Sequence, residues 1–379
     1  MHQSSANQRR IMLAGGGTAG HVNPLLAVVE ALRSAAPGVA CCWVGSERVE
    51  SRLVPAYGVD FQQIDIRFSW RAPTPANWGY YRRHILPLAL GRPFRQAQAA
   101  LDEFAPDMVL ASGGYVAAPV LWAAQRSGVP FALLQIDSPP GLVNWWFAPH
   151  AWRVYAATAA IAEEYSARLA RGKMLITGSP ALKPRRTREQ FCAAQGIDPR
   201  RRLIVAMGGS LGAGAIHRAI RELLTEAARD GAPRWAQLAL LNIGGEREAL
   251  AAGLLDAAGA TGGPIALHSV GYLEHAIDAL YAADFYIGRS GAATVGELIA
   301  CGVPALLIPD PQHADRQQYR NAATLVERGQ ATVVEQRQVT GEVILQWLKR
   351  AWQAPRFSAP APAPAETIAA DLKAALEAR

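Results

Sequence analysis

The stretch Gly15-Gly16-Gly17-Thr18-Ala19-Gly20-His21 follows a short apolar run and leads into a segment whose apolar residues recur at helical spacing. This order predicts a strand, a glycine-rich turn and a helix. Glycines in such a turn let the backbone adopt positive φ and approach a ligand closely, and the N–H groups at the helix start favour an anion, most often a phosphate. His21 would face the same site, although a surface histidine after a plain turn gives the same pattern.

The composition is that of a soluble globular protein, with 379 residues, of which 50% are hydrophobic and 18% are charged. This length allows two domains, each with its own core. No apolar run approaches the roughly 18 to 20 residues that span a bilayer, and residues 1–10 lack the apolar core of a signal peptide. The four cysteines show neither metal-binding nor disulfide spacing, which is typical of reduced thiols in a cytoplasmic protein.

The net charge of +7 is distributed unevenly along the chain. Residues 1–175 contain 16 Lys and Arg against 11 Asp and Glu, together with seven of the ten tryptophans. This combination favours an anionic, apolar partner, such as a lipid surface or a phosphorylated substrate. The predicted membrane-facing patch is residues 78–94 together with Trp145, Trp146 and Phe147. The alternative is an amphipathic helix that packs on its own sheet.

Strand and helix signals alternate from residue 10 to about residue 155, which indicates a doubly wound parallel sheet. After a proline-rich, basic segment, a second series begins with the glycine turn Gly208-Gly209-Ser210-Leu211-Gly212-Ala213. The same strand, glycine turn and helix thus occur once in each half, which is far more specific than either motif alone. We predict an N-terminal domain, a linker, a C-terminal domain and a terminal helix that packs back on the first domain: residues 1–177, 178–190, 191–357 and 366–379.

The remaining expected elements follow from short apolar runs and from helical spacing. The expected strands are residues 39–44, 61–66, 108–111, 131–135, 203–207, 238–242, 285–287 and 305–308. The expected helices include residues 48–57, 94–104 and 366–377. An Ala- and Pro-rich segment, residues 358–364, is expected to be extended.

A third strand and turn lie in the second half, at Ile287-Gly288-Arg289-Ser290-Gly291-Ala292-Ala293. Ser290 is the expected N-cap of the helix that follows. The N–H groups of Gly291, Ala292 and Ala293 would then be left for a phosphate. This turn therefore predicts a second anion site, on the C-terminal domain.

Polar side chains beyond this turn suit a sugar nucleotide. Glu297 follows within two helical turns and is near enough to accept hydrogen bonds from both hydroxyls of a ribose, although a solvated helix glutamate gives the same pattern. Gln317 and Gln318 follow another strand and suit sugar hydroxyls, because an amide both donates and accepts.

Several enzyme classes lack support in the sequence. A dinucleotide dehydrogenase needs an acidic residue about 20 positions past its glycines, at the end of the second strand. Here that strand ends at Ser46, and Glu47 belongs to the start of the next helix, which weakens the nicotinamide interpretation without eliminating it. The chain has no Walker sequence, no HExxH motif and no nucleophile elbow, and no spacing of His or carboxylate residues predicts a metal site.

Taken together, these segments resemble the MurG family of bacterial UDP-N-acetylglucosamine transferases, which convert lipid I to lipid II in peptidoglycan synthesis. The similar segments occur in the family's order: residues 15–24, 45–58, 113–119, 208–213, 289–302 and 313–321. The resemblance implies a GT-B architecture, in which two Rossmann-like, doubly wound parallel-sheet α/β domains face a central cleft. It places the UDP-sugar on the C-terminal domain and a membrane-associated acceptor mainly on the N-terminal one, with no metal or other cofactor.

The resemblance also implies an inverting transfer, in which an acceptor hydroxyl attacks the anomeric carbon and UDP leaves from the opposite face. His21 would be the general base, with Asp137 as a second candidate. Helix N-termini would stabilise the charge of the diphosphate without a cation. The implied donor-binding residues are Gly209, Ser210, Gly212, Leu273, Ser290, Gly291, Ala292, Glu297, Gln317 and Gln318. The implied acceptor- and phosphate-binding residues are Gly16, Gly17, Thr18, Gly20, Gly113, Gly114, Tyr115 and Asn144.

Three segments depart from the family pattern. The family's His-Glu-Gln-Asn on the acceptor side reads Leu134-Gln135-Ile136-Asp137, and its Gly-Asn-Pro-Val-Arg at the linker reads Gly178-Ser179-Pro180-Ala181-Leu182. The family's glutamine in the second glycine turn is Leu211. Donor-side residues are therefore largely kept, whereas acceptor-side residues are altered.

The expected function is transfer of a sugar, most simply N-acetylglucosamine, from a UDP-sugar to a lipid-(pyro)phosphate acceptor, as in lipid II synthesis. The altered residues leave open a different lipid-phosphate acceptor, such as a phosphoglycolipid antibiotic precursor. A nucleotide-sugar epimerase on the same fold and a non-catalytic UDP-sugar-binding protein also stay open. We expect a cytoplasmic protein that is peripheral on the anionic inner face of the plasma membrane and binds no nucleic acid.

Overall fold

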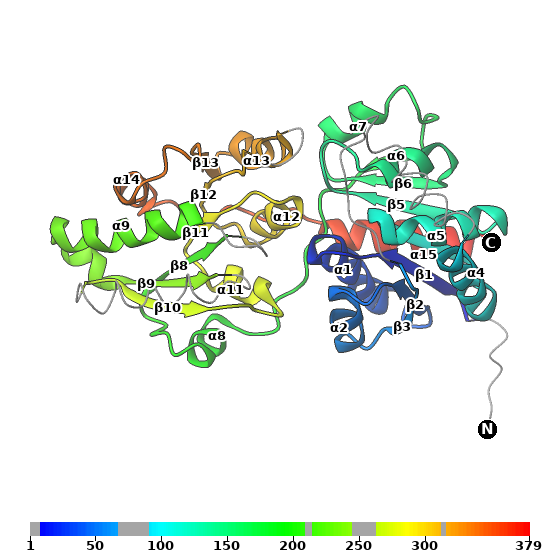
Figure 1. Ribbon diagram of the computed structural model, residues 1–379, viewed down its shortest axis with the longest axis horizontal. Coiled ribbons are helices and arrows are strands. Elements are labelled where there is room, and N and C mark those ends of the chain that lie inside the picture. The colour runs from blue at the N-terminus through cyan, green and yellow to red at the C-terminus, as the bar shows by residue number, and fades with distance from the viewer. Residues whose placement is uncertain (1–7, 67–90, 209–213, 245–262, 312–315) are drawn as a thin grey trace. The chain divides into compact units, whose positions relative to one another are not determined.

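The structure is a computed structural model that describes residues 8–66, 91–208, 214–244, 263–311 and 316–379 (Figure 1). The chain forms two compact units. The first comprises residues 1–182 and 361–379, and the second comprises residues 183–360. The chain therefore leaves the first unit once and returns to it at its C-terminal end.

The first unit is built on a seven-stranded parallel sheet of order β3-β2-β1-β4-β5-β6-β7. Its strands are β1 (Arg10–Gly15), β2 (Ala40–Gly45), β3 (Asp60–Gln63), β4 (Met108–Gly113), β5 (Phe131–Gln135), β6 (Arg153–Ala156) and β7 (Met174–Ile176). The strand order reverses between β1 and β4. In open parallel sheets, ligands bind at the carboxyl ends of the strands that flank such a reversal.

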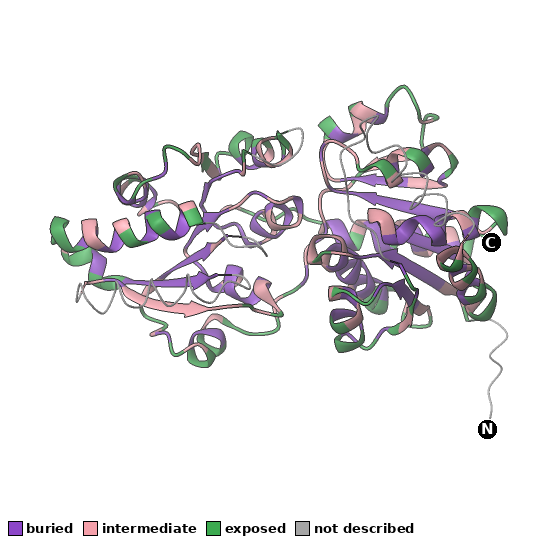
Figure 2. Ribbon diagram, viewed as in Figure 1, coloured by how far each residue is buried: buried purple, intermediate pink, exposed green. Residues whose placement is uncertain are grey.

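Helices cover both faces of this sheet (Figure 1). They are α1 (Ala19–Ala35), α2 (Val49–Ala56), α4 (Arg92–Phe104), α5 (Gly114–Arg126), α6 (Leu142–Phe147), the 3-10 turn η3 (Ala148–His150), α7 (Ala159–Tyr165) and α15 (Pro364–Glu377). The central strands are consequently buried on both sides, and Figure 2 shows them as a continuous buried layer. Met12, Leu13, Leu110 and Leu133 are all 0% exposed, which explains why these strands are nearly uninterrupted apolar runs.

The C-terminal helix α15 packs against α1 in the first unit (Figure 1). Asp371 of α15 accepts hydrogen bonds from the Arg153 Nε atom at 3.0 Å and from the Tyr155 hydroxyl at 2.9 Å, both on β6. The Arg153 Nη2 atom donates to the second oxygen of this carboxylate at 3.3 Å. This carboxylate thus ties the end of the chain to the first sheet.

The second unit contains a six-stranded parallel sheet of order β10-β9-β8-β11-β12-β13. Its strands are β8 (Arg202–Met207), β9 (Leu238–Ile243), β10 (Ala266–Val270), β11 (Phe285–Gly288), β12 (Ala305–Leu307) and β13 (Ala331–Val333). Its helices are α8 (Arg188–Ala194), α9 (Gly214–Asp230), the 3-10 turn η4 (Pro233–Gln237), α11 (Ala276–Ala282), α12 (Ala292–Cys301), α13 (Gln317–Glu327) and α14 (Gly341–Ala351). Here the strand order reverses between β8 and β11, and β8 is followed in the sequence by the second glycine turn.

The predicted fold class, two Rossmann-like parallel-sheet α/β domains, is confirmed. Most predicted bounds are shifted by one to three residues, and two of the shifts have a clear local cause. The strand expected over 61–66 ends at Gln63, because the Ile66 N–H bonds back to the Ile64 carbonyl oxygen at 2.9 Å and leaves the ladder. The helix expected from residue 94 begins at Arg92, because Pro93 fits the first turn, where its missing N–H costs nothing. None of the helices in the described ranges combines the length and apolar character that crossing a bilayer requires.

Candidate functional site

The first glycine turn, between β1 and α1, is closed by a buried carboxylate. Glu50 is 0% exposed and accepts hydrogen bonds from the backbone N–H groups of Gly17 at 2.9 Å and Ser46 at 3.0 Å. The Ser46 hydroxyl donates to the same carboxylate at 2.5 Å. Gly17 has φ of +86°, and a Cβ atom at Gly16 would lie 2.2 Å from a Glu50 oxygen. Both glycines are therefore required by the turn.

The residues after this turn begin α1 without a side-chain cap. Thr18 is the N-cap residue and has extended backbone, and its hydroxyl makes no capping bond. The first turn, which contains Gly20 and His21, carries no acidic side chain. An uncapped helix start presents backbone N–H groups to an anion. The N–H of Gly17, one of the predicted phosphate donors, is instead bonded to Glu50.

His21 is half-buried and lies beside the end of β4. Its Nδ1 atom is 3.1 Å from the carbonyl oxygen of Ser112, and the Ser112 hydroxyl donates to the His21 carbonyl oxygen at 2.7 Å. Because a carbonyl can only accept, the neutral ring carries its proton on Nδ1 and keeps Nε2 as an acceptor. A Cβ atom at Gly114 would lie 3.6 Å from Nε2. This nitrogen therefore lies beside Gly113 and Gly114, which are called the second glycine pair below.

The second glycine pair joins β4 to α5. Gly113, with φ of +87°, is the N-cap of α5, and a Cβ atom there would lie 2.7 Å from Oδ1 of Asn144. Asn144 is 3% exposed and donates to the Leu134 carbonyl oxygen at 3.0 Å. The Tyr115 ring would contact a Cβ atom at Gly17 at 3.4 Å. Burial raises the pKa of the Tyr115 hydroxyl above its ordinary value.

The predicted acceptor-side residues of the first unit therefore gather at the carboxyl ends of β1, β4 and β5, where the strand order reverses. Asp137, the second candidate base, follows β5 and is half-buried. Its carbonyl oxygen accepts a hydrogen bond from Gln135 at 2.6 Å. Gln135 also accepts from Asn144 at 2.8 Å and from the Tyr165 hydroxyl at 3.2 Å. The altered acceptor segment is thus tied into a buried polar network.

The donor side of the second unit differs from expectation at Ser290. Gly291, not Ser290, is the N-cap of α12, and no side chain caps this helix. The Ser290 side chain is buried, and its hydroxyl donates to the Gln318 carbonyl oxygen at 2.8 Å. The predicted N-cap is therefore wrong, because a longer-range bond to α13 takes this hydroxyl. The uncapped N–H groups at Gly291 and Ala292 are consistent with the predicted anion site.

Glu297 lies in the second turn of α12 and is 6% exposed, so the alternative of a solvated glutamate is wrong. Burial raises the pKa of the Tyr286 hydroxyl, and the nearby Glu297 carboxylate raises this pKa further. The Gln318 amide oxygen accepts from the Asp310 N–H at 2.8 Å, and Gln317 is the first residue of α13. Leu273 lies half-buried between β10 and α11. Three predicted donor residues, Gly209, Ser210 and Gly212, lie outside the described residues.

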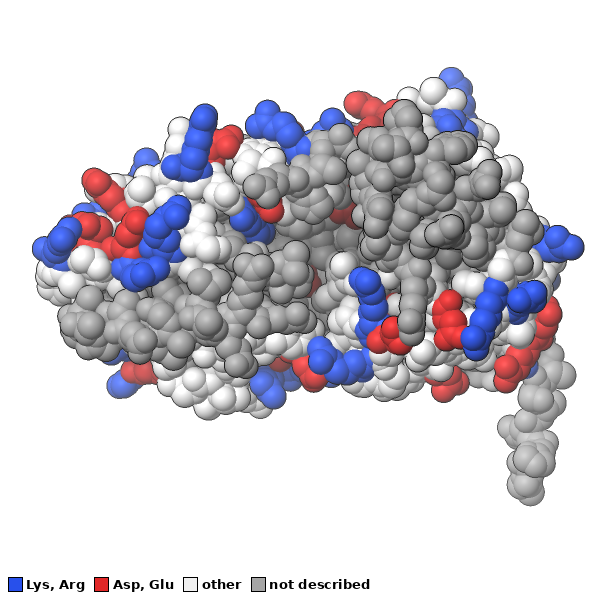
Figure 3. Space-filling model, viewed as in Figure 1, with Lys and Arg blue, Asp and Glu red and all other residues white. Residues whose placement is uncertain are grey.

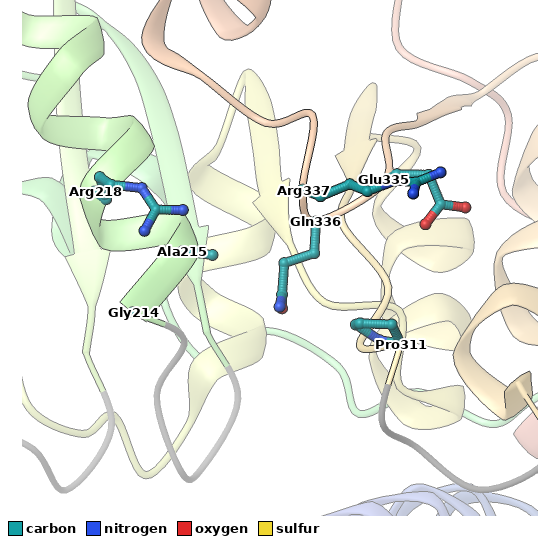
Figure 4. A pocket seen from close by; sticks show the side chains of 7 residues that line it. All are labelled: Gly214, Ala215, Arg218, Pro311, Glu335, Gln336 and Arg337. Carbon is teal, nitrogen blue, oxygen red and sulfur yellow. The ribbon is translucent and has the colours of Figure 1, made fainter.

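A cavity of about 610 Å³ lies in the second unit, at the carboxyl ends of β8, β12 and β13 (Figure 4). Its lining comprises Gly214, Ala215, Arg218, Pro311, Glu335, Gln336 and Arg337. In Figure 4, Arg218 and Gln336 point into the cavity. Arg289 fixes the Gln336 side chain, because its Nη2 atom donates to the Gln336 amide oxygen at 2.5 Å.

None of these lining side chains has a role predicted from the sequence. A signal existed for Arg218, because a basic residue one turn into a helix that follows a glycine turn suits a bound phosphate. Arg337 and Gln336 lie more than 100 residues further along the chain and carry no local signal. Within the described ranges, no group of His, Cys, Asp or Glu side chains could hold a metal ion.

Family models match both halves of the chain. Residues 11–156 match the glycosyltransferase family 28 N-terminal domain, and residues 203–376 match the glycosyltransferase family 28 C-terminal domain. Two relatives bear the name UDP-N-acetylglucosamine–N-acetylmuramyl-(pentapeptide) pyrophosphoryl-undecaprenol N-acetylglucosamine transferase. One, from Burkholderia ambifaria, is 35% identical over 91% of this chain and 88% of its own length. The other, from Frankia casuarinae, is 34% identical over 89% of this chain and 86% of its own length.

Solved structures share the fold. MurG from Acinetobacter baumannii superimposes with a TM-score of 0.64 at 24% identity, covering 97% of this chain and 99% of its own. A putative UDP-N-acetylglucosamine 2-epimerase from Listeria monocytogenes has a TM-score of 0.70 at 14% identity, covering 99% of this chain and 98% of its own. At these identities the likeness concerns the architecture alone.

Proposed function

Because this chain belongs to glycosyltransferase family 28, we propose that it transfers N-acetylglucosamine from UDP-N-acetylglucosamine to lipid I and thereby forms lipid II. Relatives at 34% and 35% identity are named for this hexosyl transfer. The observation that carries the proposal is the orientation of His21, whose Nδ1 faces the Ser112 carbonyl oxygen and whose Nε2 lies at the second glycine pair. This tautomer leaves Nε2 as a proton acceptor, which supports the role of general base.

In the proposed reaction, the Nε2 atom of His21 takes the proton of an acceptor hydroxyl. The hydroxyl oxygen forms a bond to the anomeric carbon as the bond from that carbon to the diphosphate oxygen breaks on the opposite face. UDP leaves with the electron pair of the broken bond, and the configuration inverts. Asp137 stays the second candidate for the base, since it lies at the end of the neighbouring strand β5.

We assign the acceptor to the first unit. The diphosphate of a lipid-linked acceptor suits the uncapped start of α1, at Thr18 and Gly20, and the start of α5 after Gly113. The other proposed contacts come from residues gathered around the same strand ends: Gly16, Gly17, Gly114, Tyr115 and Asn144.

We assign the donor to the second unit. Glu297 would bind the ribose, the Leu273 backbone the uracil, and Gln317 and Gln318 the transferred sugar. The diphosphate would bind Ser210 and the surrounding glycines together with the uncapped start of α12: Gly209, Gly212, Ser290, Gly291 and Ala292. Arg218, which points into the cavity at the start of α9, would add a positive charge. Two helix starts and a guanidinium can stabilise the leaving diphosphate, so we propose that the transfer needs no metal or other cofactor.

We further propose a cytoplasmic enzyme that is peripheral on the inner face of the membrane. Leu142 and Trp146 lie four residues apart on α6 and are 59% and 64% exposed. The guanidinium of Arg168 lies 4.5 Å from the ring centroid of the neighbouring Trp145. An exposed apolar pair beside a basic side chain suits the headgroup region of an anionic bilayer.

Other parts of the predicted membrane patch are placed differently. Residues 78–90 lie outside the described residues. Phe94 packs against the core, and Arg92 pairs with Asp65 at 2.7 Å. Phe147 is 1% exposed, so the expected aromatic cluster presents only Trp146 as a largely exposed ring. On the face shown in Figure 3, basic and acidic side chains are interspersed over the described parts of both units.

The other interpretations have less support. The epimerase structure shares the fold at 14% identity, whereas relatives above 30% identity are named as transferases. A different lipid-phosphate acceptor is suggested by the altered residues 134–137, and of these Gln135 is occupied by internal hydrogen bonds.

Mass spectrometry of products tests the proposal directly. The purified protein is incubated with UDP-N-acetylglucosamine and either lipid I or a panel of other lipid phosphates. We expect one N-acetylhexosamine to be added to lipid I. Transfer to another lipid phosphate alone would overturn the acceptor assignment, and C2 epimerisation of the donor without any transfer would overturn the reaction class.

A further inference from the structure

A buried carboxylate under the acceptor site has no role in the reaction described above. Glu50 lies in the first turn of α2, the helix of the chain's second βα unit, yet its side chain reaches the first glycine turn, 33 residues earlier in the sequence. It is 0% exposed, and its two oxygens accept from Gly17 and Ser46. We propose that Glu50 is a positioning residue, which holds the glycine turn and thereby His21 in the geometry that acceptor attack requires. This inference rests on the proposed function.

The carboxylate fixes the orientation of one peptide group in the turn. Because the Gly17 N–H points at Glu50, the Gly16 carbonyl of the same peptide must point the opposite way. That carbonyl oxygen lies 3.3 Å from the position of a Cβ atom at Gly114. The turn is therefore held between Glu50 on one side and the second glycine pair on the other.

The Gly16–Gly17 peptide lies immediately before α1, so its orientation affects where the helix starts. Only Thr18 separates Gly17 from the first helical residue, and the His21 N–H bonds to the Thr18 carbonyl oxygen at 3.1 Å. The His21 ring is then fixed from its other side by Ser112. A rotation of the Gly16–Gly17 peptide would thus move the start of α1 and shift Nε2 relative to the acceptor hydroxyl.

The chemistry of the contact requires a carboxylate. Three donors, the N–H groups of Gly17 and Ser46 and the Ser46 hydroxyl, converge on two oxygens. A glutamine in this place would present an NH₂ group to one of these donors, and two donors facing each other repel. The contact to Gly17 also takes one N–H away from the anion. A bound phosphate is therefore directed to the following N–H groups of α1, on the His21 side of the turn.

The first test compares Glu50→Gln with Asp107→Asn as a matched control. Asp107 also accepts a backbone N–H, from Arg10 at 2.7 Å, but it lies at the amino ends of β1 and β4. Both variants are assayed at a temperature where circular dichroism shows them folded. We expect Glu50→Gln to lower kcat/KM for the acceptor at least about tenfold, with UDP affinity within about twofold of wild type. Equal activity of the two folded variants would overturn the proposal.

A second variant, Glu50→Asp, tests the same contact in case Glu50→Gln does not fold. Glu50→Asp keeps the charge but is one methylene shorter, so its carboxylate can stay with Ser46 while losing the Gly17 N–H. The same acceptor-specific loss is expected. Wild-type acceptor kinetics in a folded Glu50→Asp protein would contradict the role of the Gly17 contact.

A spectroscopic readout separates positioning from general stability and does not depend on turnover. Nitrogen-15 NMR of the His21 ring reports its tautomer, and hydrogen exchange reports protection of the Gly17 amide. We expect Glu50→Gln to speed exchange at Gly17 and to move the His21 signals away from the single Nδ1–H tautomer, with Asp107→Asn unchanged. Unaltered His21 signals in Glu50→Gln would refute positioning. A wild-type protein that transfers no sugar would instead refute the proposed function, whatever the NMR result.

Discussion

The Nδ1 atom of His21 lies 3.1 Å from the carbonyl oxygen of Ser112, at the end of β4. This contact joins α1, the helix that follows β1, to β4, and the strand order of the first sheet reverses between β1 and β4. It sets the tautomer of the ring, because a carbonyl can accept only from a protonated nitrogen. The remaining nitrogen, Nε2, is then a proton acceptor at the carboxyl edge of the sheet, which is where parallel sheets bind their ligands.

Replacing His21 by alanine should lower kcat by about a hundredfold or more and leave UDP affinity nearly unchanged, because only proton removal from the acceptor is lost. Steady-state kinetics and calorimetry measure the two quantities. His150→Ala, an exposed histidine in the same unit, serves as the control. Near-normal turnover of His21→Ala at saturating acceptor would move the role of base to Asp137.

Replacing Glu297 by alanine should weaken UDP binding. Glu297 is 6% exposed in the helix behind the predicted diphosphate site. Losing a hydrogen bond to a buried charge costs on the order of 1.5 to 3 kcal/mol. Isothermal titration with UDP measures this cost. Glu327→Ala, at the exposed end of α13, should bind UDP like the wild type, and equal affinity of both variants would remove Glu297 from the donor site.

Replacing Asp371 by asparagine should loosen the C-terminal helix from the first unit. The carboxylate accepts from Arg153 and Tyr155, and the ion pair has about a quarter of each side chain exposed, 24% and 24%. Loss of these charged hydrogen bonds should lower the free energy of unfolding by about 1.5 to 3 kcal/mol. Glu377→Gln, whose pair with Lys373 is an exposed contact of 3.9 Å, should change it by less than about 1 kcal/mol. Urea unfolding distinguishes the two, and equal stabilities would contradict a structural role for Asp371.

Acidification should destabilise the protein partly through His217. This side chain of α9 is 2% exposed and lies beside Asn242, and burial lowers its pKa below the ordinary value of 6.5. The unfolded chain therefore binds this proton at a higher pH than the folded chain does. The free energy of unfolding accordingly falls as the pH drops below 6.5 towards the lowered pKa, and it is fully retained above 6.5.

His217→Asn should flatten this dependence. Thermal unfolding between about pH 5 and pH 7.5 measures the slope for the wild type and the variant. His150→Asn, at an exposed position, should keep the wild-type slope. If His217→Asn retained the full slope as well, the pH dependence would have to arise from other groups.

Replacing Trp146 by serine should weaken binding to anionic vesicles. Trp146 and Leu142 expose one apolar face of α6, and basic side chains near an anionic surface add about 1 kcal/mol each. We expect wild-type binding to decrease with salt and to be absent with neutral vesicles, as measured by sedimentation. Val326→Ser, which removes an exposed apolar side chain of α13, is the control. Wild-type protein that sediments with neither type of vesicle would contradict the membrane assignment.

Much of the architecture follows from local pattern. The run of apolar residues before Gly15 and the helical spacing after His21 specify a strand, a turn and a helix, and the same pattern recurs around Gly208. Such signals lie within a dozen consecutive residues, so they can be read without knowing the fold. The alternation of these units then indicates parallel sheets, and the order of the glycine turns and polar segments identifies the family.

The tertiary structure decided which groups meet across long separations. The sequence offers no sign that Glu50 would turn inward to the Gly17 N–H, or that Arg218 and Gln336 would line one cavity. The Ser290 hydroxyl does not cap α12 as the local sequence predicts, because it donates to the Gln318 carbonyl oxygen, 28 residues away. A local N-cap preference is worth about 1 kcal/mol. A buried polar group needs a hydrogen-bond partner, and that partner can come from any part of the chain that packs beside it. Only the packed chain determines that partner.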